Sequence, residues 1–99
     1  MSSIFNFSLN RNSLKILTAQ ETFSALPGQS RDLEKVLTIP SGAAVQQVIT
    51  TVKTGYARTV NITERGFSVS GTQLTVGFCL GCTDTAQRDV TVFITCLYK

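Results

Sequence analysis

Two cysteines three residues apart, Cys79 and Cys82, form the sharpest chemical motif of this sequence. Such a pair can act as a redox centre or as half of a zinc site. A structural zinc ion needs about four ligands, but the chain has only one further cysteine, Cys96, and no histidine, which leaves a carboxylate such as Asp84 as the fourth ligand. A thioredoxin-like pair would open a helix, whereas this pair ends a strand-like run. We therefore expect structural thiols, with Cys79 at a strand end, Cys82 in the following turn and Cys96 in the neighbouring strand, and no metal or cofactor.

General acid–base chemistry would need titratable groups gathered in a cleft. Most of the six carboxylates stand beside a cation in a predicted turn, as in Arg31-Asp32 and Glu64-Arg65, and such pairs are usually solvated. The absence of histidine removes the commonest base that works near neutral pH. There is also no nucleophile elbow and no glycine-rich phosphate loop. These observations predict a protein that is not an enzyme.

One set of polar and aromatic residues could recognise a sugar. Carbohydrate sites combine an exposed ring with polar groups that fix hydroxyls. The candidates for this role are Tyr56, Arg58, Asp84 and Thr85.

Length and composition limit the remaining classes of protein. Ninety-nine residues predict a single β domain over 1–99, and 42% hydrophobic residues suffice for a core. The net charge of +3 is dispersed along the chain, so nucleic-acid binding is not expected. No run approaches the roughly 18 apolar residues of a membrane span, and residues 1–6 do not resemble a secretory signal, so we expect neither membrane insertion nor secretion by a signal peptide.

The positions that must carry these side chains follow a two-residue hydrophobic period, most clearly from Arg58 to Tyr98. Short alternating runs separated by turn residues predict an all-β fold, a small antiparallel β-sandwich or partly open barrel of about six to eight short strands. Pro27-Gly28 predicts a type II turn, and Glu64–Gly66 predicts another turn. A strand is favoured over a short helix for residues 34–39, and a bulge at Gln46-Gln47 would restore the alternation of its strand.

The last strand is apolar on both faces. Every second residue from Val90 to Cys96 is apolar, and Phe93 and Leu97 occupy the opposite face. Such a strand lies between two layers or is covered by a second chain. We therefore expect a homo-oligomer, with a trimer favoured, or attachment to a larger protein shell.

The alternating residues at the N-terminus suit addition to a neighbour's sheet. Residues 1–10 are expected to form an extended arm or an edge strand, with Phe5 and Phe7 as contact residues. Phe93 and Leu97 are the expected contacts on the last strand.

Two resemblances add to this interpretation. The stretch Val60–Val69 together with the strand Val90–Leu97 resembles a strand–turn–strand of H-type lectin domains, which implies a six-stranded, trimeric, sugar-binding sandwich. The chain departs from those domains in having no tryptophan near the last strand. Its Thr/Ser/Val-rich strands, with Phe5–Leu9 and Val92–Lys99 at the ends, resemble the small β modules of tailed-bacteriophage virions.

These observations lead to one expected function and two alternatives. We expect a non-enzymatic virion subunit, of the capsid cement or decoration type or of the head–tail or tail accessory type, made in the host cytoplasm and acting through protein–protein contacts. The alternatives are a carbohydrate-binding attachment module and a phage-encoded inhibitor of a host protein.

Overall fold

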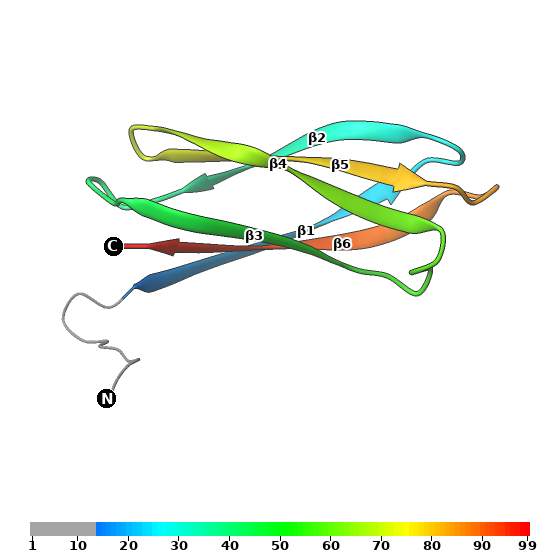
Figure 1. The fold of residues 1–99 in the computed structure, drawn as a ribbon, viewed down its shortest axis with the longest axis horizontal. Helices are drawn as coiled ribbons and strands as arrows, with labels where there is room; N and C mark the ends of the chain where they lie inside the picture. Colours follow the sequence, from blue (N-terminus) through cyan, green and yellow to red (C-terminus); the bar gives the residue numbers. More distant parts are fainter. Residues whose placement is uncertain (1–13) are drawn as a thin grey trace.

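The computed structural model describes residues 14–99, which form six antiparallel strands in two three-stranded sheets (Figure 1). The strands are β1 Lys15–Ala25, β2 Ser30–Thr38, β3 Val45–Lys53, β4 Val60–Ser70, β5 Gln73–Cys82 and β6 Arg88–Tyr98. One sheet has the strand order β1–β6–β3 and the other has the order β2–β5–β4. The two sheets pack face to face, which confirms the predicted small β-sandwich. None of the described residues forms a helix long and apolar enough to cross a membrane.

The core comes from the central strand of each sheet. In β6 every second residue from Val90 to Cys96 is at most 1% exposed, and in β5 every second residue from Leu74 to Leu80 is at most 2% exposed. Successive side chains of a strand point to opposite faces, so each of these sets lies on one face of its sheet. Facing the two sets towards each other removes both from water, which is the main favourable contribution to folding. The rings of Phe23 and Phe78 meet edge to face in this layer, with their centroids 5.4 Å apart.

The turn between β1 and β2 forms where the sequence predicts it. Gly28 has a φ of 64°, and the Gln29 amide donates to the carbonyl oxygen of Leu26 at 3.2 Å. Proline fixes φ at the first central position and glycine accepts positive φ at the second, as a type II turn requires. The predicted turn at Pro27-Gly28 is confirmed.

The turn predicted at Glu64–Gly66 is wrong. These residues lie inside β4, where the pairing with β5 shifts register between Glu64 and Gly66. Gly66 has a φ of 123°, and Arg65 is the additional residue of a β-bulge. A glycine that follows charged residues is typical of both a tight turn and a β-bulge, because both need a residue that accepts positive φ. The sequence alone does not distinguish the two. The strands expected on either side are therefore one continuous strand.

Of the other local predictions, one bulge is confirmed and one strand has different bounds. The bulge predicted at Gln46-Gln47 is present as a register shift between Val45 and Gln47. The strand expected over 34–39 runs instead over Ser30–Thr38. The first described strand, β1, pairs with β6 along all eleven of its residues.

The arm expected over residues 1–10 and its contact residues Phe5 and Phe7 lie outside the described residues.

The position of Phe78 gives a first prediction. Its side chain is fully buried, so Phe78→Ala should lower the free energy of unfolding by about 3–5 kcal/mol, through lost burial and the cavity that remains. Urea denaturation followed by circular dichroism measures the change. The matched control is Val36→Ala, because Val36 is 51% exposed on the outer face of the same sheet; it should cost no more than about 1 kcal/mol. Equal losses in the two variants would contradict the assigned core.

Candidate functional site

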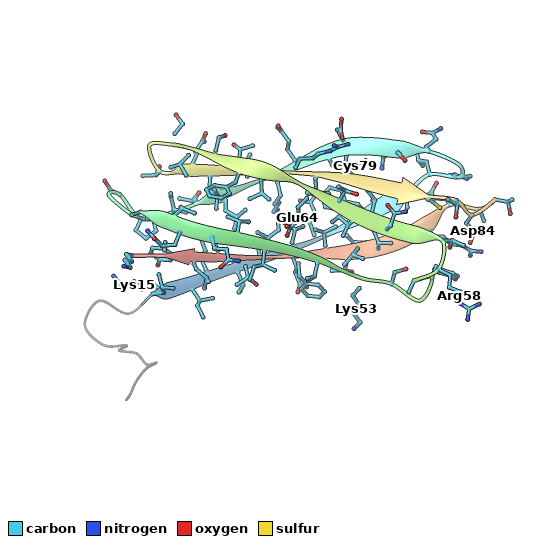
Figure 2. The ribbon with its side chains drawn as sticks, in the orientation of Figure 1. Lys15, Lys53, Arg58, Glu64, Cys79 and Asp84 are labelled. Atoms are coloured by element: carbon cyan, nitrogen blue, oxygen red, sulfur yellow. The ribbon has the colours of Figure 1, made fainter. Side chains whose placement is uncertain are left out.

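Three of the four residues predicted for a sugar site meet at one end of the sandwich. The loops after β3 and β5 lie together there, and Figure 2 labels Asp84 in this region. Asp84 Oδ1 accepts from the backbone amides of Thr85 at 2.7 Å and Ala86 at 3.3 Å. The Thr59 hydroxyl lies 3.3 Å from Asp84 Oδ2 and 3.3 Å from the Tyr56 carbonyl oxygen, so it links the two loops.

The cation of this cluster is Arg88, which the sequence analysis did not select. Its Nε donates to Asp84 Oδ2 at 3.0 Å, and its guanidinium carbon lies 4.0 Å from the centroid of the Tyr56 ring. The hydrogen bond from Arg88 is the main cause that lowers the pKa of Asp84, and the same bond raises the pKa of Arg88. The predicted Arg58 is not part of these contacts. A signal was available, since Asp84 and Arg88 stand four residues apart across a short loop.

This end cluster is arranged to hold loops together. Both oxygens of the Asp84 carboxylate already accept hydrogen bonds from within the protein. One face of the Tyr56 ring carries the Arg88 guanidinium, a cation–π contact that stabilises the pair. A sugar that used these groups would have to displace internal partners, so the geometry favours a structural role for the cluster.

The two cysteines of the Cys-x-x-Cys motif belong to opposite faces of one strand. In β5, Cys79 pairs with Asp32 and faces outward, whereas Cys82 pairs with Val60 and faces the core. All three cysteines are free thiols, and burial raises the pKa of Cys96. Cys79 lies within its strand and Cys82 is the last residue of that strand, not a turn residue. Cys96 belongs to β6 in the other sheet, so its expected place in a neighbouring strand is wrong.

No group of three or more histidines, cysteines and carboxylates among residues 14–99 is placed to hold a metal ion.

A shallow groove on the outer face of the β2–β5–β4 sheet escaped the sequence analysis. It lies over Gly77, which has no side chain to fill it, between Glu34 and the pair Asp32 and Arg65. Arg65 Nε lies 3.4 Å from Asp32 Oδ1, and the Cys79 thiol and then Asp32 raise the pKa of Arg65. The bulge in β4 creates this proximity, at residues where the sequence predicts a turn. Its charged side chains are largely exposed, which is typical of a solvated surface.

The predicted contact residues Phe93 and Leu97 belong to an apolar face. They project from the outer side of β6, the central strand of its sheet, and are half-buried. The register places Leu97 beside Ile16 of β1, and Ile49 of β3 beside the Thr95 that separates Phe93 from Leu97. Ile16 is 65% exposed and Ile49 is 39% exposed. We call Ile16, Ile49, Phe93 and Leu97 the apolar face.

The surroundings of the apolar face carry no charge over most of the sheet. Threonine and glutamine side chains lie between its members, and the ionisable side chains of this face lie towards its two ends. Lys53 of β3 and Asp89 of β6 are near the end where β3 finishes, and Lys99, which pairs with Ala44, is at the other. Figure 2 shows Lys53 projecting away from the opposite sheet. Large exposed apolar patches are typical of interaction surfaces.

Comparisons of the chain with known protein families, with curated protein sequences and with solved structures find no match.

The thiols provide a second prediction. A thiol reagent such as 5,5′-dithiobis(2-nitrobenzoate) should label Cys79 alone in the folded protein, because Cys82 and Cys96 are buried. Addition of denaturant should bring the total to three thiols. Cys79→Ser is the control and should abolish labelling before unfolding. Rapid labelling of two thiols in the native protein would contradict the opposite orientation of the motif.

The end cluster provides a third prediction, on pH. Because the pKa of Asp84 is lowered in the folded protein, its contribution to stability is fully present above the unfolded value of about 3.9 and is lost as pH falls through the folded value. Asp84→Asn should therefore reduce the free energy of unfolding at pH 7 more than at pH 2. Asp89→Asn changes an exposed carboxylate of the adjoining strand and is the control. A destabilisation by Asp84→Asn that does not vary between the two pH values would show that the charge of Asp84 is not what stabilises the loops.

Proposed function

We propose that this protein is a non-enzymatic structural subunit that works by burying the apolar face against another protein, as the cement, decoration and tail accessory proteins of virions do. The observation that supports this is the row of exposed and half-buried apolar side chains on the outer face of the β1–β6–β3 sheet. The partners that fit are further copies of the chain, with a trimer as the favoured oligomer, or a larger protein shell.

The size of the sheet agrees with such a contact. Three strands at about 4.8 Å spacing and eleven residues at about 3.3 Å present a projected face of about 500 Å². Side-chain walls increase the accessible area beyond this projection, so the face approaches the roughly 800 Å² that one partner contributes to a standard interface. A contact over the whole sheet, and not over the apolar face alone, would therefore be needed for stable association.

The composition of the face suits a protein partner. Phe93 and Leu97 are half-buried between the flanking strands β1 and β3, so they lose less side-chain entropy on binding than fully exposed side chains would. The threonine and glutamine side chains around them can form hydrogen bonds at the rim, where interfaces are normally polar. Nucleic acid would require concentrated positive charge, and this face has none near its centre.

A carbohydrate-binding module remains the alternative from a different class. It would need the ring of Tyr56 and the carboxylate of Asp84, and both already have partners within the protein. A glycan array distinguishes the two functions, since binding of a defined sugar by the purified protein would favour the attachment module.

The proposal predicts a loss of association. Ile49→Lys places a charge within the apolar face, where burial without a partner is costly, so self-association should weaken about tenfold or more, as measured by native mass spectrometry over a concentration series. Val36→Lys changes a 51% exposed valine on the outer face of the other sheet and should leave association unchanged. A wild-type protein that stays monomeric and binds no assembled capsid or tail would contradict the proposal.

A further inference from the structure

The two open edges of the sandwich are protected very differently. At the edge formed by β1 and β2, charged side chains point into the space between the sheets. Lys35 Nζ lies 2.9 Å from Glu21 Oε1, and the Arg31 guanidinium donates to the Ser24 carbonyl oxygen. Charged residues that point inward at an edge are a device by which proteins discourage further strands from adding. This edge is therefore closed.

The edge formed by β3 and β4 is closed along only part of its length. Glu64 lies between the two sheets in Figure 2, and its Oε2 accepts from the backbone amide of Thr50 at 2.7 Å. This bond satisfies one outward amide of the edge strand β3. Beyond the bulge, towards the β4–β5 turn, the five residues Gly66–Ser70 carry no charge.

Apolar side chains lie exposed in that unprotected part. Phe67 pairs with Val76 and Val69 pairs with Leu74, so both belong to the core-facing side of β4. Their neighbours in β5 are at most 2% exposed, yet Phe67 is 43% exposed and Val69 is 44% exposed. Side chains directed towards the core are thus left uncovered at this edge. A small pocket between the sheets opens beside Phe67.

The strand that faces this opening is equally uncharged. From Val45 to Val52, β3 contains only apolar and uncharged polar residues. The backbone of β4 has a strand partner on one side only among the described residues, because β4 is an edge strand. An uncharged edge with apolar side chains is a template for a further strand.

We propose that residues Phe5–Leu9 of a second copy of this chain add as a strand at the β4 edge, over Gly66–Ser70, and cover Phe67 and Val69. This deepens the proposed function, on which it rests, by naming the acceptor for the arm.

Three properties match donor and acceptor. Both segments are five residues long and lack ionisable side chains. Added as a strand, the donor would place Phe5, Phe7 and Leu9 on one face, with the same two-residue period as Phe67 and Val69. Its main chain would supply hydrogen bonds to the free side of β4, and its rings would supply the missing apolar cover, as in other cases of strand addition.

The topology favours a donor from another copy. The described chain begins at Leu14, just before β1, and β1 lies at the edge of its sheet opposite to β3. The acceptor thus lies at the far edge of the sandwich from the start of β1. An arm from the same copy would have to cross the sandwich to reach β4, whereas an arm from a neighbouring copy would not.

Complementation between two full-length variants tests the proposal. One variant carries Phe5→Asp and Phe7→Asp, which remove the apolar side chains of the arm and leave the β4 edge unchanged. The other carries Phe67→Lys, which gives the β4 edge an inward charge like those at the closed edge and leaves the arm intact. Both are made in the Ile49→Lys background, so that association through the apolar face does not obscure the result. Native mass spectrometry identifies the species.

The expected result has three parts. The Ile49→Lys parent still forms oligomers, each arm or edge variant alone is a monomer, and a mixture of the two variants forms a heterodimer. A mixture that stays monomeric overturns the proposal, as does an oligomer that survives the arm substitutions, which would indicate pairing of two β4 edges. A monomeric Ile49→Lys parent also overturns it, while leaving the apolar face as the sole contact.

Two controls keep the result interpretable. Val69→Lys replaces Phe67→Lys if the latter fails to fold by circular dichroism. Val36→Lys adds the same charge to the outer face of the same sheet, on the opposite edge strand β2, and should leave the oligomer unchanged. If the apolar face proves irrelevant, the wild type and the Ile49→Lys variant have the same oligomeric state, and the arm can still be tested; the two proposals therefore fail separately.

Discussion

The structure depends on the mutual burial of the inner faces of β5 and β6. Each is the central strand of a three-stranded sheet, so each brings two flanking strands with it. An isolated sheet of this size would leave Phe78 or Ile94 in water on one side, and burying a side chain of that size contributes about 1.5–3 kcal/mol. Facing the two sheets towards each other is how a chain of this length covers both sets of side chains.

That solution leaves two outer faces and two edges, and the chain treats them unequally. The outer face of the β2–β5–β4 sheet is charged around a glycine floor, with Asp32 and Arg65 in contact. The outer face of the β1–β6–β3 sheet is apolar around Phe93 and Leu97. One edge carries inward charges such as Lys35, while the other exposes Phe67. The apolar face and the edge at Phe67 are thus the two uncharged surfaces, and no other described part of the sandwich covers them.

The end cluster shows how candidate chemistry can serve the fold. A carboxylate, an arginine and a tyrosine in two facing loops have the composition of a binding site. Here each group satisfies another, since Asp84 accepts from two backbone amides and from Arg88, and Arg88 covers Tyr56. Buried or half-buried polar groups need such partners, and loops that join two sheets provide them. The same residues would have to lose these partners before they could bind a ligand.

The core strands could be predicted from the residues alone, because the alternation from Leu74 to Leu80 and from Val90 to Cys96 places one apolar set on a single face of an extended strand, whatever its neighbours. The β1–β2 turn could be predicted in the same way, since Pro27 fixes φ and Gly28 accepts a positive φ without help from the rest of the chain. The folded structure was needed to show which sheet each strand joins, that Glu64–Gly66 is a bulge within a strand, and that Arg88 and not Arg58 lies beside Asp84. It alone revealed that Phe67 follows the core alternation yet remains exposed at an edge. Those outcomes depend on which strands become neighbours, and contacts between residues distant in sequence leave no periodic trace in the residues themselves.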